Sequence, residues 1–292
     1  MQFSIITPSF RASAWLKLCI ESVADQGVDL EHIIQDAVSD DGTMDWLPQE
    51  KRVKAYFEKD RGMYDAVNRG LRKAKGDILA YINCDEQYLP GALKAVEKCF
   101  AENPNAEMVL ADSLVINEDG SLNCFRKVHI PWESHTRLDS LCALTCSIFF
   151  RRSLIDDRKL FFSDRLRDLG DGDWMVRALR AGVRMKVLRY YTAAFTETGA
   201  NMNLKPNAIR EKAEFRAAAP LWMRLGKPLL SRAYHVKRLF EGGYFEKPLT
   251  YEIYTKQSPA KRVRFEAPKP SPFWKRVPLK AEHTGAEVRA AG

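Results

Sequence analysis

Residues 58–86 read EKDRGMYDAVNRGLRKAKGDILAYINCDE, and this stretch decides the fold. An acidic, glycine-containing turn opens a short helical pattern, and the apolar strand at residues 80–82 follows. That strand ends in Asn83, Asp85 and Glu86, whose oxygens are hard donors that suit Mg²⁺ or Mn²⁺ rather than zinc. Because ligands of open α/β sheets gather outside the carboxyl ends of the strands, this order predicts a cation site there.

The two carboxylates also have a simpler interpretation. Residues 89–93, LPGAL, indicate the start of a helix. Acidic side chains favour the amino end of a helix, so Asp85 and Glu86 fit a capping role as well as they fit a metal site. Segments elsewhere in the chain decide between the two.

The amino-terminal segment carries two further strand and loop pairs. Residues 3–10 have the pattern of a buried strand that a proline ends, and residues 14–24 that of an amphipathic helix. A second strand at residues 31–35 runs into the acidic turn 36–43. An Asp just after a strand accepts hydrogen bonds from a nucleobase N–H or a ribose hydroxyl, although a turn that caps the helix near residues 44–47 is the alternative.

Three such loops in this order resemble the family 2 glycosyltransferases, which have the GT-A fold and use nucleotide sugars. Residues 5–10 are similar to the family's opening strand, residues 36–43 to its acidic turn and residues 83–86 to its DxD-type motif. The block at residues 60–70 is the most specific part, and the resemblance covers residues 3–200. It implies an α/β fold, a GT-A type α/β/α sandwich with a mostly parallel central sheet.

The resemblance also implies site residues. Asp85, with Glu86 beside it, is the expected ligand of an Mn²⁺ or Mg²⁺ cofactor, and Asp36 the expected acceptor from the uracil N3–H. Asn83 and Glu86 both stand where the family usually has Asp. The expected nucleotide-sugar pocket comprises Pro8, Ser9, Asp36, Asp60, Arg61, Asp65, Asn68 and Asn83.

Residues 168–182, DLGDGDWMVRALRAG, form a second group of acids. The apolar spacing from residue 173 to 179 is helical and Gly182 supplies a stop, so the acids lie at the amino end of a helix. The resemblance places Asp171 on the family's catalytic aspartate, with Asp173 as a second candidate. Gly170 stands where the family often has Glu, and helix capping remains the alternative role for both acids.

These residues predict an inverting transferase. Transfer from a nucleoside diphosphate requires stabilisation of the leaving group and removal of a proton from the acceptor hydroxyl. Asp85 with its cation serves the first need and Asp171 the second. The expected donor is a UDP-sugar and the expected acceptor a saccharide or lipid-linked hydroxyl, in cell-surface polysaccharide synthesis.

Three alternative functions fit the sequence less well than a transferase does. The departures at Asn83, Glu86 and Gly170 fit an inactive GT-A domain that binds a nucleotide sugar or a partner. A nucleotidyltransferase needs a glycine-rich loop after the first strand, and residues 9–13 contain no glycine. A dehydrogenase needs GxGxxG there, which is absent.

The middle of the chain is less informative. Residues 105–117 predict a strand with Asp112 near its end, and residues 122–126 its hairpin partner. His129, Trp132 and His135 lie in a loop where they either touch a sugar or are solvated or buried. The segment 144–152 resembles the strand before the catalytic helix, without the His-Gln pair that many relatives carry.

Composition predicts a catalytic domain at residues 1–202, a basic amphipathic helical extension at 203–257 and a loosely ordered tail at 258–292. Residues 203–292 hold 19 Lys and Arg against 8 Glu, whereas residues 1–202 hold 27 against 30 acids. Helices at residues 221–225 and 229–240 suit peripheral contact with the anionic inner face of a membrane; packing on the catalytic domain is the alternative. No nucleic-acid-binding module accompanies the charge.

Localisation follows from two patterns. The six cysteines show no CxxC pairing and residues 1–4 have no signal-peptide pattern, which together favour a reducing cytoplasm. No stretch approaches the roughly 20 apolar residues of a membrane span.

Overall fold

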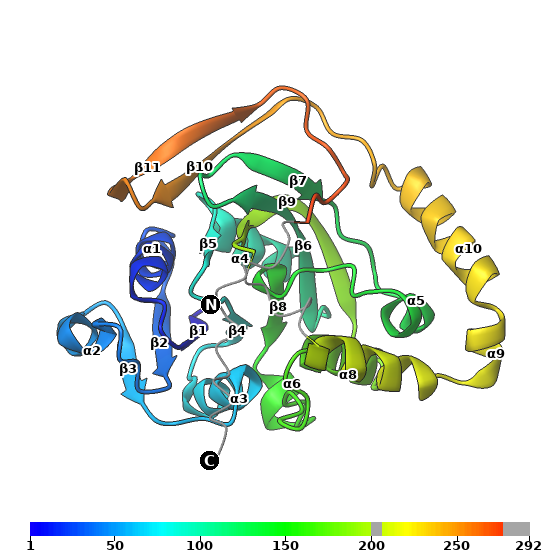
Figure 1. Cartoon of the computed structure of the whole chain (residues 1–292), viewed down its shortest axis with the longest axis horizontal. Helices are drawn as coiled ribbons and strands as arrows, with labels where there is room; N and C mark the ends of the chain where they lie inside the picture. The colour runs from blue at the N-terminus through cyan, green and yellow to red at the C-terminus, as the bar shows by residue number, and fades with distance from the viewer. Residues whose placement is uncertain (200–205, 277–292) are drawn as a thin grey trace, which may run out of the picture.

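The structure, a computed structural model, describes residues 1–199 and 206–276. Its centre is one mixed sheet with the order β3-β2-β1-β4-β8-β6-β9-β5, and β7 pairs with β6 (Figure 1). The strands are β1 Phe3–Ser9, β2 Leu30–Asp36, β3 Lys54–Phe57, β4 Ile78–Tyr81, β5 Glu86–Tyr88, β6 Met108–Asn117, β7 Leu122–Arg126, β8 Ile148–Arg151 and β9 Met185–Glu197.

Helices cover both faces of this sheet. The helices within residues 1–199 are α1 Ser13–Ala24, α2 Thr43–Trp46, α3 Met63–Lys73, α4 Ala92–Glu102, α5 Glu133–Leu138, α6 Ser153–Asp156 and α7 Gly170–Arg180, with 3-10 turns at Leu47–Gln49 and Thr145–Ser147. Alternate side chains of a strand point to opposite faces, so Phe3 and Ile5 of β1 pack with α1 and α4, whereas Ile6 packs with α3 and α7. The predicted α/β fold is confirmed.

Parallel pairing brings the predicted loops together. β1 pairs in parallel with both β2 and β4, and β2 with β3. The carboxyl ends of these strands therefore meet at one edge of the sheet, where the loops at residues 7–12, 36–43 and 82–86 lie side by side. Gly70 permits close packing behind this edge, because a Cβ there would lie 2.5 Å from Ile6 Cγ2.

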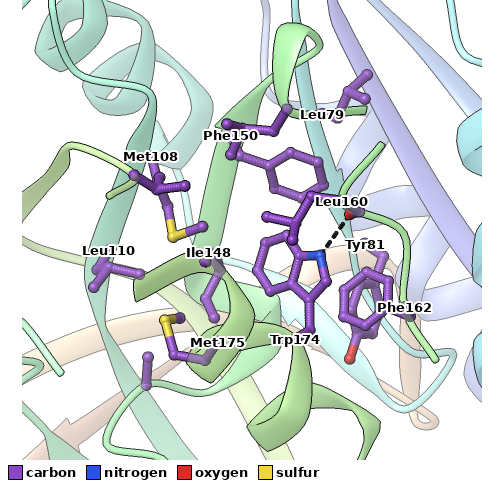
Figure 2. Packing of buried hydrophobic residues seen from close by; sticks show 14 of the residues in the cluster. Leu79, Tyr81, Met108, Leu110, Ile148, Phe150, Leu160, Phe162, Trp174 and Met175 are labelled. Atoms are coloured by element: carbon purple, nitrogen blue, oxygen red, sulfur yellow. Dashed lines mark hydrogen bonds between the residues drawn. The ribbon is translucent and has the colours of Figure 1, made fainter. Parts of the chain in front are cut away.

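Trp174 anchors α7, the helix that carries the predicted catalytic acids. It is 1% exposed, and its ring stacks on Phe162 with centroids 4.7 Å apart. Its Nε1–H donates to the Leu160 carbonyl at 2.7 Å (Figure 2). A large aromatic side chain with its one polar atom satisfied fixes the position of the helix firmly.

The carboxyl-terminal region differs from the prediction. Helices α8 Pro206–Ala217, α9 Leu221–Leu225 and α10 Lys227–Phe240 are followed by an antiparallel hairpin of β10 Leu249–Thr255 and β11 Ser258–Ala267. A purely helical extension is therefore not confirmed, and residues 258–267 are a strand rather than a loosely ordered tail. Alternating residues such as Val263 and Phe265 pair with β10, which supplies the hydrogen bonds that the isolated segment lacks. Residues 277–292 lie outside the described residues.

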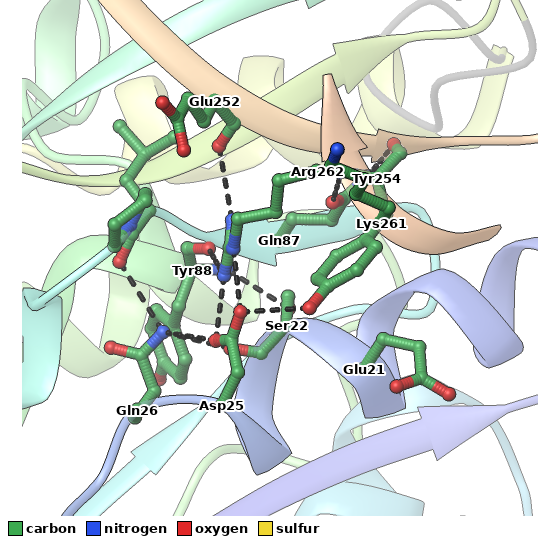
Figure 3. Close-up of polar contacts among 12 residues, drawn as sticks. Glu21, Ser22, Asp25, Gln26, Gln87, Tyr88, Glu252, Tyr254, Lys261 and Arg262 are labelled. Carbon is green, nitrogen blue, oxygen red and sulfur yellow. Dashed lines mark hydrogen bonds and ion pairs between the residues drawn. The ribbon is translucent and has the colours of Figure 1, made fainter. Parts of the chain in front are cut away.

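The hairpin is fixed to α1 by polar contacts (Figure 3). The Arg262 guanidinium donates to both Asp25 carboxylate oxygens, at 2.6 and 2.7 Å, and the Tyr254 hydroxyl donates to Asp25 at 2.8 Å. Gln87 of β5 exchanges two hydrogen bonds with the Tyr254 backbone. These contacts hold the β10–β11 hairpin against α1 and β5.

Two further predictions concern strand β6, and one of the two is confirmed. The hairpin at residues 118–126 is confirmed, because β6 pairs antiparallel with β7. Asp112, expected near the end of its strand, lies in the middle of β6, where Arg189 pairs with it at 2.8 Å.

Among residues 1–199 and 206–276, no helix is long and apolar enough to cross a bilayer.

Candidate active site

A cavity of about 970 Å³ opens at the carboxyl edge of the sheet. Its walls come from the end of β1, the start of α3, the loop after β4, the start of α7, helix α8 and the last described residues. Of the predicted site residues, this cavity brings together Pro8, Ser9, Asp60, Asn83, Asp85 and Asp171.

Asp171 lies in the first turn of α7 and is half-buried. Its Oδ1 accepts a hydrogen bond from the Gly172 N–H at 2.7 Å. Burial raises the pKa of Asp171 above its ordinary value of 3.8, while the hydrogen bond from Gly172 opposes the shift. A carboxylate whose pKa is raised is, when ionised, a stronger base than a solvated Asp.

Tyr64 positions Asp171. The Tyr64 hydroxyl accepts a hydrogen bond from the Asp171 N–H at 3.1 Å, and its ring is buried against Gly170. A Cβ at residue 170 would lie 2.6 Å from the Tyr64 ring, so no larger residue fits there. The glycine that departs from the resembled family therefore has a packing reason.

The DxD-like segment presents one carboxylate to the cavity. Asp85 is half-buried and lines it, as does Asn83. Glu86 does not line the cavity: it is fully buried, and its Oε2 accepts a hydrogen bond from the Asn83 N–H at 2.7 Å. Glu86 supports the loop here, because β5 begins at this residue and turns it inward, and its metal role stays a prediction.

The residues present fit a divalent cation held through Asp85. Burial, and next the charge of Glu197, raise the pKa of Asp85, and a bound cation would relieve both effects. Across the described chain, no group of three His, Cys, Asp or Glu side chains has metal-binding geometry. Mg²⁺ and Mn²⁺ do not require such a cage, because phosphate oxygens and water complete their coordination.

On the nucleotide side, Asp36 is not on the cavity surface. It is fully buried and accepts hydrogen bonds from Ser9 Oγ at 2.8 Å and from Ser39 N–H at 2.7 Å. Pro8, Ser9 and Asp60 do line the cavity. Asp36 therefore shapes the loop that carries Ser9, and a direct contact with a base remains a prediction.

Three other predicted residues face away from this cavity. Asp65 is buried, and it pairs with Arg69 at 2.9 Å. Asn68 exchanges two hydrogen bonds with the Phe162 backbone. Arg61 pairs with Asp164 and lines a neighbouring hollow. Each of the three has a partner within the protein, and their contacts with a nucleotide sugar stay predictions.

The remaining candidates also lie elsewhere. Asp173 pairs with Arg177 at 2.7 Å and does not line the cavity. His129 is buried and contacts Glu241, and His135 stacks on Tyr234 with ring centroids 3.5 Å apart. Trp132 packs on the core. None of these three aromatic residues reaches the cavity.

Some residues that line the cavity are not predicted from the sequence. Phe10 and Tyr81 line it from segments whose pattern indicates only the ends of strands. Arg126, Trp274 and Arg276 come from β7 and from beyond β11. No local pattern signals these last three, because they reach the cavity only through pairing with distant strands.

Comparisons with known proteins agree with this geometry. The family model described as "Glycosyl transferase family 2" matches residues 4–155, just over half of the chain. A PGL/p-HBAD biosynthesis glycosyltransferase of Mycobacterium bovis is 28% identical over 236 residues, covering 77% of this chain and 86% of that protein. The putative teichuronic acid biosynthesis glycosyltransferase TuaG of Bacillus subtilis is 31% identical over 144 residues, covering 47% of this chain and 56% of that protein.

Two solved structures share the fold. S. aureus TarS 1-349 in complex with UDP-GlcNAc has a TM-score of 0.59 at 17% identity, covering 82% of this chain and 73% of that one. The mannosyltransferase PcManGT from Pyrobaculum calidifontis, in complex with GDP-Man and Mn²⁺, has a TM-score of 0.51 at 17% identity, covering 81% and 80%. With the match across residues 4–155, the chain belongs to glycosyl transferase family 2.

Proposed function

We propose that this chain is an inverting, metal-dependent glycosyltransferase that moves a sugar from a UDP-sugar to a hydroxyl of a saccharide or lipid-linked acceptor. The observation that carries the proposal is that one cavity holds both Asp85 and Asp171. One carboxylate is placed for the leaving group and the other for the incoming hydroxyl. TarS bound to UDP-GlcNAc and PcManGT bound to Mn²⁺ support the donor class and the cation.

The roles of the side chains follow from their environments. The acceptor oxygen forms a bond to the anomeric carbon while the bond from that carbon to the diphosphate oxygen breaks. Asp171 takes the acceptor proton, and Tyr64 holds the Asp171 backbone in place. Asp85 would hold the divalent cation, whose charge stabilises the leaving diphosphate. Attack from the face opposite the nucleotide inverts the anomeric carbon, so no covalent sugar intermediate is required.

Nucleotide release from a panel of UDP-, GDP- and dTDP-sugars with Mn²⁺ or Mg²⁺ tests the proposal. We expect metal-dependent release from a UDP-sugar, lost in Asp85→Ala and in Asp171→Asn, with UDP binding retained in Asp171→Asn. Metal-dependent UDP binding without release, even with saccharide acceptors added, would favour an inactive nucleotide-sugar-binding domain. Absence of both binding and release would overturn the glycosyltransferase proposal.

We also propose that helices α9 and α10 contact an anionic membrane surface. Leu225 and Leu229 are 75% and 74% exposed, and Trp222 beside them is also exposed. The exposed cations Arg224 and Arg232 lie on the same two helices. Apolar side chains that enter the lipid boundary, together with cations that meet its headgroups, are typical of interfacial helices.

Vesicle sedimentation tests this surface. We expect the protein to bind vesicles that contain phosphatidylserine more tightly than vesicles of phosphatidylcholine alone, and Leu225→Gln with Leu229→Gln to weaken this binding. Ile209, exposed on α8, offers a matched control as Ile209→Gln. Equal binding of the double variant and the control would show that α9 and α10 do not face the membrane.

A further inference from the structure

The carboxyl-terminal wall of the cavity carries three cations with little to balance them. Arg126 ends β7, Lys212 lies on α8, and Arg276 lies in the C-terminal strap, which we define as residues 271–276. Within the described residues, the Arg126 guanidinium makes no hydrogen bond or ion pair, and its Nε is buried without a partner. Lys212 is half-buried and likewise has no hydrogen bond or ion pair among the described residues.

The third cation is held in place from two sides. Arg276 lies over the Trp274 ring, with Cζ 3.5 Å from its centroid, and its guanidinium lies 3.5 Å from Glu197. Trp274 Nε1–H donates to the same Glu197 oxygen at 2.6 Å. Arg126 approaches the Trp274 ring from 5.9 Å. Of the three cations, Arg276 alone contacts the buried Glu197 carboxylate within the described residues.

The strap itself is tied to β7. Asn123 accepts a hydrogen bond from the Lys275 N–H at 2.9 Å and donates to the Lys275 carbonyl at 2.8 Å. The Phe125 N–H donates to the Ser271 carbonyl at 3.0 Å. Trp274 and Arg276 are therefore placed by pairing, so the cluster is a built part of the cavity.

A half-buried guanidinium cannot lose its charge, and an unpaired one is costly to keep away from water. The cost is removed when an anion with several oxygens accepts its hydrogen bonds, and phosphate is the anion whose geometry fits a guanidinium fork. Pro8, Ser9 and Asp60, which the proposed function assigns to the donor, come from β1 and the turn before α3. The three cations come from β7, α8 and the C-terminal strap, so different segments of the chain carry the two groups.

We propose that Arg126, Lys212 and Arg276 form a subsite for a phosphate group of the acceptor, so that the acceptor is a phosphorylated or diphosphate-linked molecule. This inference rests on the proposed function, because it assigns other residues of the cavity to the donor. A donor diphosphate that used the same cations would be the competing source of the anion. The two sources differ in whether the subsite remains available when UDP is bound.

Calorimetry with phenyl phosphate as the probe separates them. We expect phenyl phosphate to bind the full chain saturated with UDP and Mg²⁺, and its Kd to rise about tenfold or more in Arg126→Gln and in Lys212→Gln. The Kd for UDP should stay within about twofold in both variants, because UDP then makes no charge-assisted hydrogen bond with either cation. Lys51→Gln, which removes an exposed cation outside the cavity, should match the wild type.

Three results would decide against the subsite. In the first, phenyl phosphate does not bind to the UDP-saturated protein. In the second, the variants lose affinity for UDP and for phenyl phosphate equally. In the third, neither variant weakens the binding of phenyl phosphate. Thermal melting checks that Arg126→Gln folds. Lys212→Gln, a change on the partly exposed face of α8, tests the subsite if Arg126→Gln does not fold. If UDP does not bind at all, the proposed donor fails, while phenyl phosphate titrated without UDP still reports on the three cations.

Discussion

At the scale of single residues, Asp171 makes activity depend on pH. Its pKa is raised by burial, and a general base acts only when ionised, so activity should rise with pH through a pKa above 3.8. We expect the acidic limb of the kcat/KM profile to lie at a higher pH than the ordinary pKa of Asp would place it, and Asp171→Asn to lower kcat by about 10²- to 10⁴-fold. Asp173→Asn, which breaks an ion pair with Arg177 outside the cavity, should change kcat by no more than about twofold. A larger loss of kcat in Asp173→Asn would indicate that Asp173 acts as the catalytic base.

Another single residue, His32, should make the fold sensitive to acid. Burial lowers the pKa of His32 from 6.5 to about 3, and Thr7 Oγ1 contacts its Nε2 at 2.9 Å. Between these two pH values the unfolded chain binds a proton that the folded chain does not, so the free energy of unfolding falls as the pH falls, by about 1.4 kcal/mol per pH unit. Urea denaturation at pH 7 and pH 5 should show a smaller loss in His32→Gln, by about 2 kcal/mol. The same loss in both proteins would mean that His32 is already charged when folded.

At the scale of elements, the β10–β11 hairpin depends on one ion pair with α1. The Arg262 side chain is only 9% exposed, so removing its partner leaves a nearly buried charge. We expect Asp25→Asn to lower the free energy of hairpin opening by about 2 kcal/mol, seen as faster hydrogen exchange in β10 and β11. Arg264→Gln is the matched control on the same strand, because Arg264 pairs with Glu266 at 3.7 Å and both side chains are exposed. Exchange in Asp25→Asn that matches the control would show that apolar packing alone holds the hairpin.

At the scale of the whole molecule, the cavity joins parts of the chain from Pro8 to Arg276. A ligand that binds only the folded cavity therefore stabilises the entire fold. At 100 times its Kd, UDP with Mn²⁺ should raise the free energy of unfolding by about 2.7 kcal/mol. Thermal melts should show this rise with UDP and Mn²⁺ together, and a smaller one with UDP in a chelator or in Asp85→Asn. Equal shifts with and without the cation would contradict the metal role of Asp85.

The sequence by itself determined the α/β order and the sheet edge at which the acidic loops gather, because these depend on local patterns of strand, turn and helix start, whereas the choice of Asp171 as base came from the family resemblance. Only the tertiary structure decided which polar side chains reach the cavity. Asp36 and Glu86 are engaged by their own loops, and the reason is hydrogen bonding that no local pattern records. The hairpin and the cationic wall were likewise decided by the tertiary structure, since long-range pairing places Arg276 beside Glu197, residues that lie 79 positions apart in the sequence.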